Sequence, residues 1–192
     1  MAMNAFFRTI AYCLLGLPGL LVMQQGSELS AYGGWGRPFF LLLYAMVLFI
    51  VVTVHEGGHA LAVRHFGWKI TLFAVFPIAY RTKTKRFELW TLPSGDLGGA
   101  VTFSTGNRIR TPGQSAVLAA AGPLANLALA FAALALTYLL PDLGPVTGGI
   151  AVASLFVGLG NLLPWQSRGG AKSDGAVLLS AIKKRRRAAR FP

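Results

Sequence analysis

The chain has 192 residues, of which 54% are hydrophobic and 12% are charged, and its mean hydropathy is +0.57. This composition is too apolar for an ordinary soluble domain and is typical of membrane proteins. The net charge of +12 suits either a nucleic-acid-binding protein or a membrane protein whose cytoplasmic loops collect Lys and Arg. The only cysteine, Cys13, lies in an apolar run, so an intrachain disulfide and a zinc finger are excluded.

Four apolar segments are expected to form membrane-spanning helices, at residues 5–24, 39–62, 115–140 and 146–164. A helix needs about 20 residues to cross a bilayer, so the second and third segments are long enough and the other two are marginal. The first segment could instead be a signal peptide, because Arg8 precedes a short apolar core. It lacks a convincing small-residue cleavage site, which favours a retained helix.

The Lys and Arg residues are distributed unevenly between these segments. The stretch 63–114 contains eight of them and the tail 165–192 contains eight more, whereas the loop 25–38 has one and the loop 141–145 has none. With four crossings and both termini in the cytoplasm, 17 of the 18 positive charges lie on the cytoplasmic side. This pattern explains the net charge without nucleic acid and predicts a multi-pass protein of the cell membrane.

Two regions on the cytoplasmic side differ from the apolar segments. Residues 68–105 are rich in β-branched and aromatic residues and are punctuated by Pro, Gly and Lys, which predicts short strands at the membrane face. The tail 174–190 is a candidate basic helix that could lie on anionic lipid, although a solvated charge cluster is an equally good interpretation. No linker divides the chain, so we expect a single domain over residues 1–192.

The second segment contains the motif His55-Glu56-Gly57-Gly58-His59. Residues four apart share a helix face, so His55 and His59 can bind one zinc ion at about 2.0–2.1 Å. Glu56 lies about 100° round the helix, off the metal but near a zinc-bound water, as a general base requires. Ionisable residues within an apolar segment are costly and mark functional sites. Gly57 and Gly58 lack side chains and would let another helix, or an unwound substrate, approach the metal closely.

A catalytic zinc ion needs three protein ligands and an open fourth position, so one ligand remains to be found. The motif lies roughly 24 Å from the outer end of its helix, and therefore near the cytoplasmic surface. This depth excludes the acids of the outer loops, Glu28 and Asp142, and leaves three candidates: Glu88, Asp96 and Asp174.

Three motifs resemble those of the site-2 proteases, which are intramembrane zinc metalloproteases, and the resemblance spans about residues 40–180. "HEGGH" resembles the zinc helix of that family. "AAGPLANLALA" resembles its Gly-Pro-x-x-Asn helix, with Gly122, Pro123 and Asn126. "NLLPWQSRGGAKSDG" resembles its Asn…Pro…Asp-Gly motif, with Asn161 and Asp174. The stretch "LGGAVTF" is similar to the membrane-associated β-structure of the family.

The resemblance implies that His55, His59 and Asp174 bind one Zn2+ per chain, that Glu56 is the catalytic base, and that the two Asn residues line the site. It implies an all-α polytopic membrane protein with about four transmembrane helices, a three-helix catalytic core and a small β-structure between the second and third helices. The implied activity is that of an intramembrane zinc metalloendopeptidase that cleaves transmembrane segments of membrane protein substrates in regulated intramembrane proteolysis. A non-proteolytic metal-binding membrane regulator and a metal-ion transporter are the alternatives.

The chain departs from the family pattern before Asp174, and Ser173 stands where a Leu often precedes the Asp-Gly pair. Thirteen positions separate Asn161 from Asp174, which is longer than the compact form of the motif, and the intervening stretch "QSRGGAKS" is polar. This insertion could cover the site or could displace Asp174. The position of Asp174 relative to the two His residues therefore decides whether it can be the third ligand.

Overall fold

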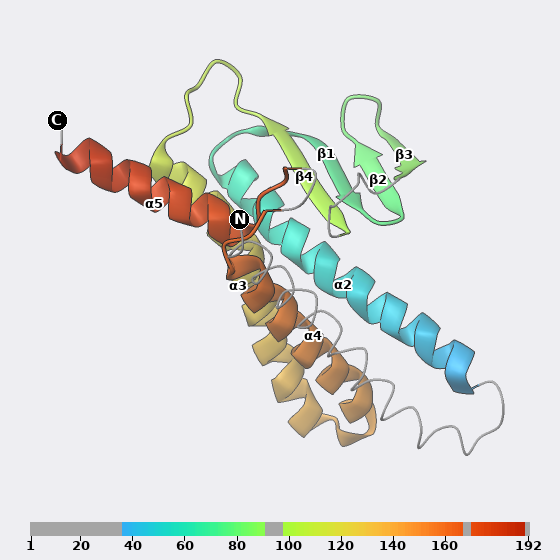
Figure 1. Ribbon diagram of the computed structural model, residues 1–192. Helices are drawn as coiled ribbons and strands as arrows, with labels where there is room; N and C mark the ends of the chain where they lie inside the picture. Colours follow the sequence, from blue (N-terminus) through green and yellow to red (C-terminus); the bar gives the residue numbers. More distant parts are fainter. Residues whose placement is uncertain (1–35, 91–97, 167–169, 191–192) are drawn as a thin grey trace.

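The computed structural model describes residues 36–90, 98–166 and 170–190 (Figure 1). The predicted helix at 5–24 lies outside the described residues, as does the candidate ligand Asp96. The described elements are, in chain order, α2 (Gly36–His65), β1 (Lys69–Val75), β2 (Ile78–Arg81), β3 (Arg86–Leu89), β4 (Gly99–Ser104), α3 (Pro112–Leu139), η2 (Pro141–Leu143), α4 (Gly144–Leu162) and α5 (Asp174–Arg190). The chain is therefore mostly helical with a small sheet.

Two of the helices, α2 and α3, are long and apolar enough to cross a membrane, over Leu42–His65 and Pro112–Leu139. The apolar stretch of α4, Val146–Leu162, is shorter. Many large apolar side chains on these helices are exposed, which suits contact with lipid better than contact with water. They include Leu42, Met46, Phe49 and Ile50 on α2, Leu124, Phe131 and Leu134 on α3, and Leu155 and Leu159 on α4.

The three apolar helices pack closely because small residues lie where they meet. A Cβ atom on Gly58 of α2 would lie 2.8 Å from Cβ of Ala125 on α3, so these two helices touch almost backbone to backbone. Val47 and Val51 of α2 pack with Ala153 and Val157 of α4 in a fully buried apolar cluster. The helix positions around the HEGGH motif are thereby fixed by direct contacts on two sides.

Helix α3 begins at a capping box. The side chain of Thr111 accepts a hydrogen bond from the Gln114 backbone N–H, and the Gln114 side chain accepts one from the Thr111 backbone N–H. Pro112 occupies the first helical position, where its missing N–H has no cost. The start of α3 is thus specified locally by the sequence.

The predicted short strands form one antiparallel sheet in the order β3-β2-β1-β4, and Phe73 of β1 pairs with Val101 of β4. The sheet packs against α2 through β1 and β4. Trp68, just after α2, stacks on Phe103 of β4 with ring centroids 5.2 Å apart. Figure 1 shows the sheet and α5 at the same end of the molecule, where α2 ends and α3 begins. Among the described strands, β4 pairs only with β1, so its other edge is free.

Candidate metal centre

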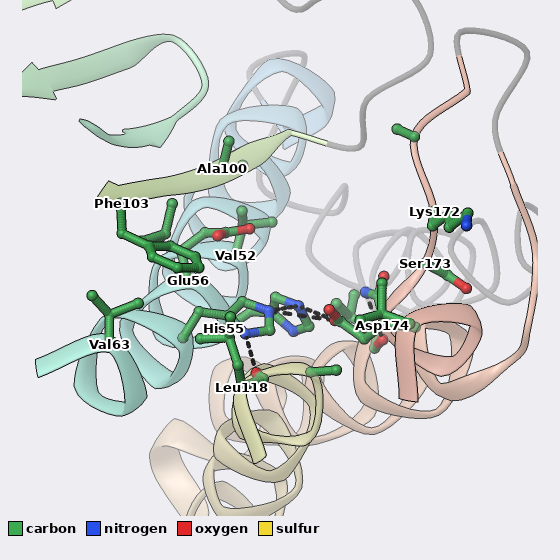
Figure 2. Close-up of a pocket in the computed structure, with 18 of the residues that line it drawn as sticks. Val52, His55, Glu56, Val63, Ala100, Phe103, Leu118, Lys172, Ser173 and Asp174 are labelled. Atoms are coloured by element: carbon green, nitrogen blue, oxygen red, sulfur yellow. Dashed lines mark hydrogen bonds and ion pairs between the residues drawn. The ribbon is translucent and has the colours of Figure 1, made fainter. Parts of the chain in front are cut away.

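Helix α2 and the first residue of α5 bring together His55, His59 and Asp174, as Figure 2 shows. The Nε2 atom of His55 lies 3.0 Å from Oδ2 of Asp174, and the Nε2 atom of His59 lies 3.4 Å from the same oxygen. The two Nε2 atoms are 3.2 Å apart. Ligand atoms bound tetrahedrally to zinc at about 2.0–2.1 Å are about 3.3 Å from one another. These three atoms therefore have the spacing of one face of a tetrahedral zinc site.

Gly122 of α3 allows the two imidazoles to pack directly against the helix backbone. A Cβ atom at this position would overlap Nε2 of His59 and would lie 2.7 Å from Nε2 of His55. Only glycine permits this close packing. The role of Gly122 was not recognised in the sequence, where it fits equally well as a kink or packing residue of a membrane helix.

The Nδ1 atoms of both His residues, which point away from Asp174, face α3. Nδ1 of His59 donates a hydrogen bond to the backbone oxygen of Leu118 over 2.8 Å, and Nδ1 of His55 lies 3.2 Å from Nδ2 of Asn126. Partners of this kind hold a metal-binding imidazole in one orientation and one tautomer. Because the first contact is to a backbone carbonyl, no residue type at position 118 could have revealed it.

The long insertion between Asn161 and Asp174 does not displace the carboxylate. The Ser173 N–H donates to the Trp165 oxygen, and the Trp165 N–H donates to Ser173 Oγ, each over 3.0 Å. Gln166 and Lys172 form an antiparallel bridge. The two ends of the insertion therefore lie side by side. As a result Asp174 lies close to Trp165, although it is nine positions later in the sequence.

Ser173 and Gly175 fix the start of α5 around Asp174. The Ser173 hydroxyl donates to the Leu163 oxygen over 2.7 Å and accepts from the Ala176 N–H over 3.2 Å, as an N-cap residue does. A Cβ atom on Gly175 would overlap the Leu162 oxygen, so the Asp-Gly pair lies directly on the end of α4. The N-cap pattern of a Ser before Asp-Gly was the signal that could have identified Ser173.

The carboxyl group of Asp174 is suited to bind a cation. Burial raises its pKa, but its hydrogen bonds with His55 and His59 and their nearby positive charge outweigh that effect and hold the pKa below its usual range. The group is therefore a carboxylate at neutral pH, which is the form that binds zinc.

Glu56 lies beside this triad in a cavity of about 360 Å³. Its side chain is buried, and a Cβ atom on Gly99 would lie 2.6 Å from its Oε1 atom, so the backbone of β4 covers it directly. Figure 2 shows β4 crossing above Glu56, and His55 and Asp174 lie below both in this view. The cavity wall also includes Asn161 at the end of α4 and the side chains of Val101 and Phe103 on β4.

The remaining residues predicted for the site do not line the cavity. Asn126 is completely buried behind His55 and is not part of the cavity wall. Gly58 faces α3, where its missing side chain permits helix packing. At Gly57, no atom from another described element lies within 4 Å of the place that a Cβ atom would occupy. Of the other candidate acids on the described residues, Glu88 pairs with Arg81 on the sheet over 2.6 Å and is not among the metal-binding groups.

The family model for Peptidase family M50 matches residues 43–143, which is more than half of the chain. The chain belongs to this family. M50 is the site-2 protease family, whose members are zinc metallopeptidases and membrane proteins. The matched M50 region includes the HEGGH motif and Asn126 and ends before Asp174, so the position of that residue rests on the structure alone. No significant match was found to a curated protein or to a solved structure.

Proposed function

We propose that this M50 protein is an intramembrane zinc metalloendopeptidase that cleaves transmembrane segments of other membrane proteins. One observation carries the proposal: two imidazole nitrogens and one carboxylate oxygen have zinc-ligand spacing and share a cavity with Glu56. Gly122 supports this arrangement because it lets both imidazoles lie against α3 and converge. His55, His59 and Asp174 would hold the ion and leave one coordination position open.

The catalytic step is hydrolysis of a peptide bond. When bound, zinc supplies Lewis-acid activation of water and of the scissile carbonyl group. The Glu56 carboxylate takes the proton that the attacking water loses and delivers it to the leaving amine. The backbone of β4 packs against Glu56, so the proton transfers would occur in a partly enclosed cavity where electrostatic interactions are stronger than in bulk water. Asn161, on the cavity wall, is close enough to contact a bound peptide.

The free edge of β4 is the proposed docking site for the substrate. A transmembrane helix hides its peptide bonds, so it must unwind locally before it can be cut, and an extended segment can then add to a sheet edge. The Phe76 N–H bonds to the Gly98 oxygen, and the strand register then directs the backbone of Ala100 toward β1 as well. By alternation, the backbone groups of Val101 point to the free edge.

A Val101→Pro substitution tests this docking mode. It removes one outward N–H without breaking the ladder to β1, and we expect cleavage of a transmembrane substrate to fall roughly tenfold, mainly through KM. Val101→Thr keeps the N–H and the branched shape and should cleave like wild type. Equal cleavage by the Pro and Thr variants would contradict strand addition.

The proposed membrane topology has four crossings, with both termini and the metal centre on the cytoplasmic side. It is supported by the asymmetric distribution of Lys and Arg and by the two helices long enough to span. In this arrangement the sheet and α5 lie at the cytoplasmic face, where water can reach the HEGGH motif without crossing the whole bilayer. Fusion of reporter enzymes to the loops 25–38 and 141–145 would test the orientation.

The basic end of α5 is proposed to lie on anionic lipid. Its side chains from Lys183 to Arg187 are all cationic and exposed, and none of them forms an ion pair within the described part of the chain. Each Lys or Arg near an anionic membrane surface contributes about 1 kcal/mol of attraction. Because Asp174 is the first residue of α5, binding of this helix to the membrane surface would also restrict the motion of the third ligand.

Neutralising these five residues to Gln should remove any stimulation of cleavage by anionic lipid. We expect wild-type protein in vesicles with phosphatidylserine to cleave a transmembrane substrate several-fold faster than in neutral vesicles, and the neutralised variant to show no difference. Lys183→Arg with Lys184→Arg keeps the charge and should behave as wild type. Equal stimulation of the neutralised variant would favour a merely solvated charge cluster.

The proposed activity is tested with purified protein, its zinc content and a transmembrane substrate. The proposal predicts one zinc ion per chain, cleavage that stops on chelation, and cleavage restored by added zinc. Bound zinc without cleavage of any transmembrane substrate would instead favour a metal-binding regulator. Zinc uptake into sealed vesicles, without cleavage, would favour a metal-ion transporter.

A further inference from the structure

Asn126 of α3 has an unusual environment for an amide in an apolar helix. Its side chain is completely buried, and its Nδ2 atom lies 3.2 Å from Nδ1 of His55. Its Oδ1 atom is buried and has no hydrogen-bond partner within the described residues. Because buried polar groups are almost always paired, this unpaired oxygen calls for an explanation.

Which end of the amide is paired depends on which end faces His55. The oxygen and the NH2 group have nearly the same size and shape, so hydrogen bonding decides the orientation. Nε2 of His55 points to Asp174 and His59, and a nitrogen that binds a metal carries no proton. The ring proton of a metal-bound His55 is therefore on Nδ1, which needs an acceptor, and an NH2 group cannot be one.

The pattern of α3 supports an acceptor at this position. Leu118, Gly122 and Asn126 are spaced four residues apart and so lie on one face of the helix. Gly122 provides the gap that receives both imidazoles, and the Leu118 oxygen accepts from Nδ1 of His59 on one side of it. The Asn126 side chain occupies the equivalent position on the other side, next to Nδ1 of His55.

We propose that Asn126 is a positioning residue whose Oδ1 atom accepts a hydrogen bond from Nδ1–H of His55 when the metal site is filled. This inference rests on the proposed function in one respect, namely that His55 is a metal ligand. With Oδ1 toward the ring, Nε2 is free to bind the ion; with NH2 toward the ring, the ring proton occupies Nε2 and faces Asp174. The orientation with Oδ1 toward the ring thus belongs to the filled site, and the orientation with NH2 toward the ring belongs to the empty site. Helix α3 orients both imidazoles without contacting the metal.

Zinc affinity, measured by competition with a chelator in detergent, tests the proposal without relying on cleavage. Asn126→Leu keeps the volume but removes the acceptor, and we expect it to weaken zinc binding by about 10- to 100-fold, as loss of such partners does elsewhere. Asn126→Asp keeps an oxygen at the same place and should bind zinc within a few-fold of wild type. Thr137→Val removes a part-buried hydroxyl about three turns further along α3, away from the site, and should leave affinity unchanged.

Equal affinity of wild type and Asn126→Leu would overturn the inference, as would an Asn126→Asp variant no better than Asn126→Leu. Nitrogen-15 NMR of zinc-loaded wild-type protein supplies a check that needs no variant, because it should find the His55 proton on Nδ1; a bare Nδ1 would also overturn it. If His55→Ala bound zinc as well as wild type, the proposed metal site itself would fail. If Asn126→Leu bound zinc as tightly as wild type while His55→Ala lost zinc, only the role of Asn126 would be rejected.

Discussion

Glu56→Gln is expected to abolish cleavage of a transmembrane substrate while leaving one zinc ion bound. The substitution keeps the size of the side chain but removes its capacity to take a proton from water, and such groups contribute about 10²- to 10⁴-fold to rate. Glu56 is adjacent to His55 in sequence, but it is not one of the three residues whose ligand atoms have metal-ligand spacing. The zinc site should therefore remain intact. Single-turnover cleavage and zinc content, measured on the same sample, check both parts.

Glu88→Gln is the matched control for that experiment. Glu88 pairs with Arg81 on the sheet and is partly exposed, so its replacement should change neither cleavage nor zinc content. Cleavage by Glu56→Gln at more than a tenth of the wild-type rate would show that another group is the base. Loss of zinc from this variant would mean that Glu56 supports the metal rather than the proton transfer.

Gly122→Ala is expected to expel zinc from the site. The added methyl group would occupy the space beside Nε2 of both His residues, so the imidazoles could no longer converge on one ion. We expect zinc affinity to fall by more than about 100-fold, beyond the loss typical of partners outside the coordination sphere, and cleavage to fall with it. Chelator competition measures the first effect.

Gly57→Ala serves as the comparison because it makes the same chemical change on an open face of α2. No atom from another element of the described chain lies within 4 Å of the added Cβ, and alanine favours helix, so zinc binding should be unchanged and stability equal or higher. If Gly122→Ala retained wild-type zinc affinity, the close packing of both imidazoles against α3 would not be what holds the zinc ligands together.

The sequence identified the residues of the zinc helix because their chemistry is local. His55 and His59 are one turn apart, and one turn of helix is enough to predict that they face the same way. Helix periodicity alone could not show whether Gly57 or Gly58 faces α3, because that depends on how the two helices pack. The structure assigns the close approach of α3 to Gly58 and leaves Gly57 open.

The contacts between elements far apart in sequence could only come from the structure. Asp174 was one of three candidate acids, and the length of the insertion before it left its position open. The pairing of Trp165 with Ser173 closes that insertion, which no count of residues predicts. The Leu118 carbonyl and the gap at Gly122 are likewise invisible in the sequence, because they act through backbone and through the absence of a side chain.

The short strands were expected from their composition, but their order was not. β1 lies between β2 and β4, so the strand that covers Glu56 is the last of the four along the chain. At the start of this strand Gly99 meets Glu56, and a glycine there lets the backbone approach closely. The partner of that approach became clear only when the sheet was placed against α2.

X-ray absorption at the zinc edge, measured on the purified protein, tests the central claim most directly. A zinc site formed by α2 and α5 should show two imidazole nitrogens and one carboxylate oxygen at about 2.0–2.2 Å with one further light atom, and its spectrum should lose a protein oxygen in Asp174→Ala. A shell made only of oxygen atoms, a sulfur ligand, or a spectrum unchanged by Asp174→Ala would contradict the site formed by α2 and α5.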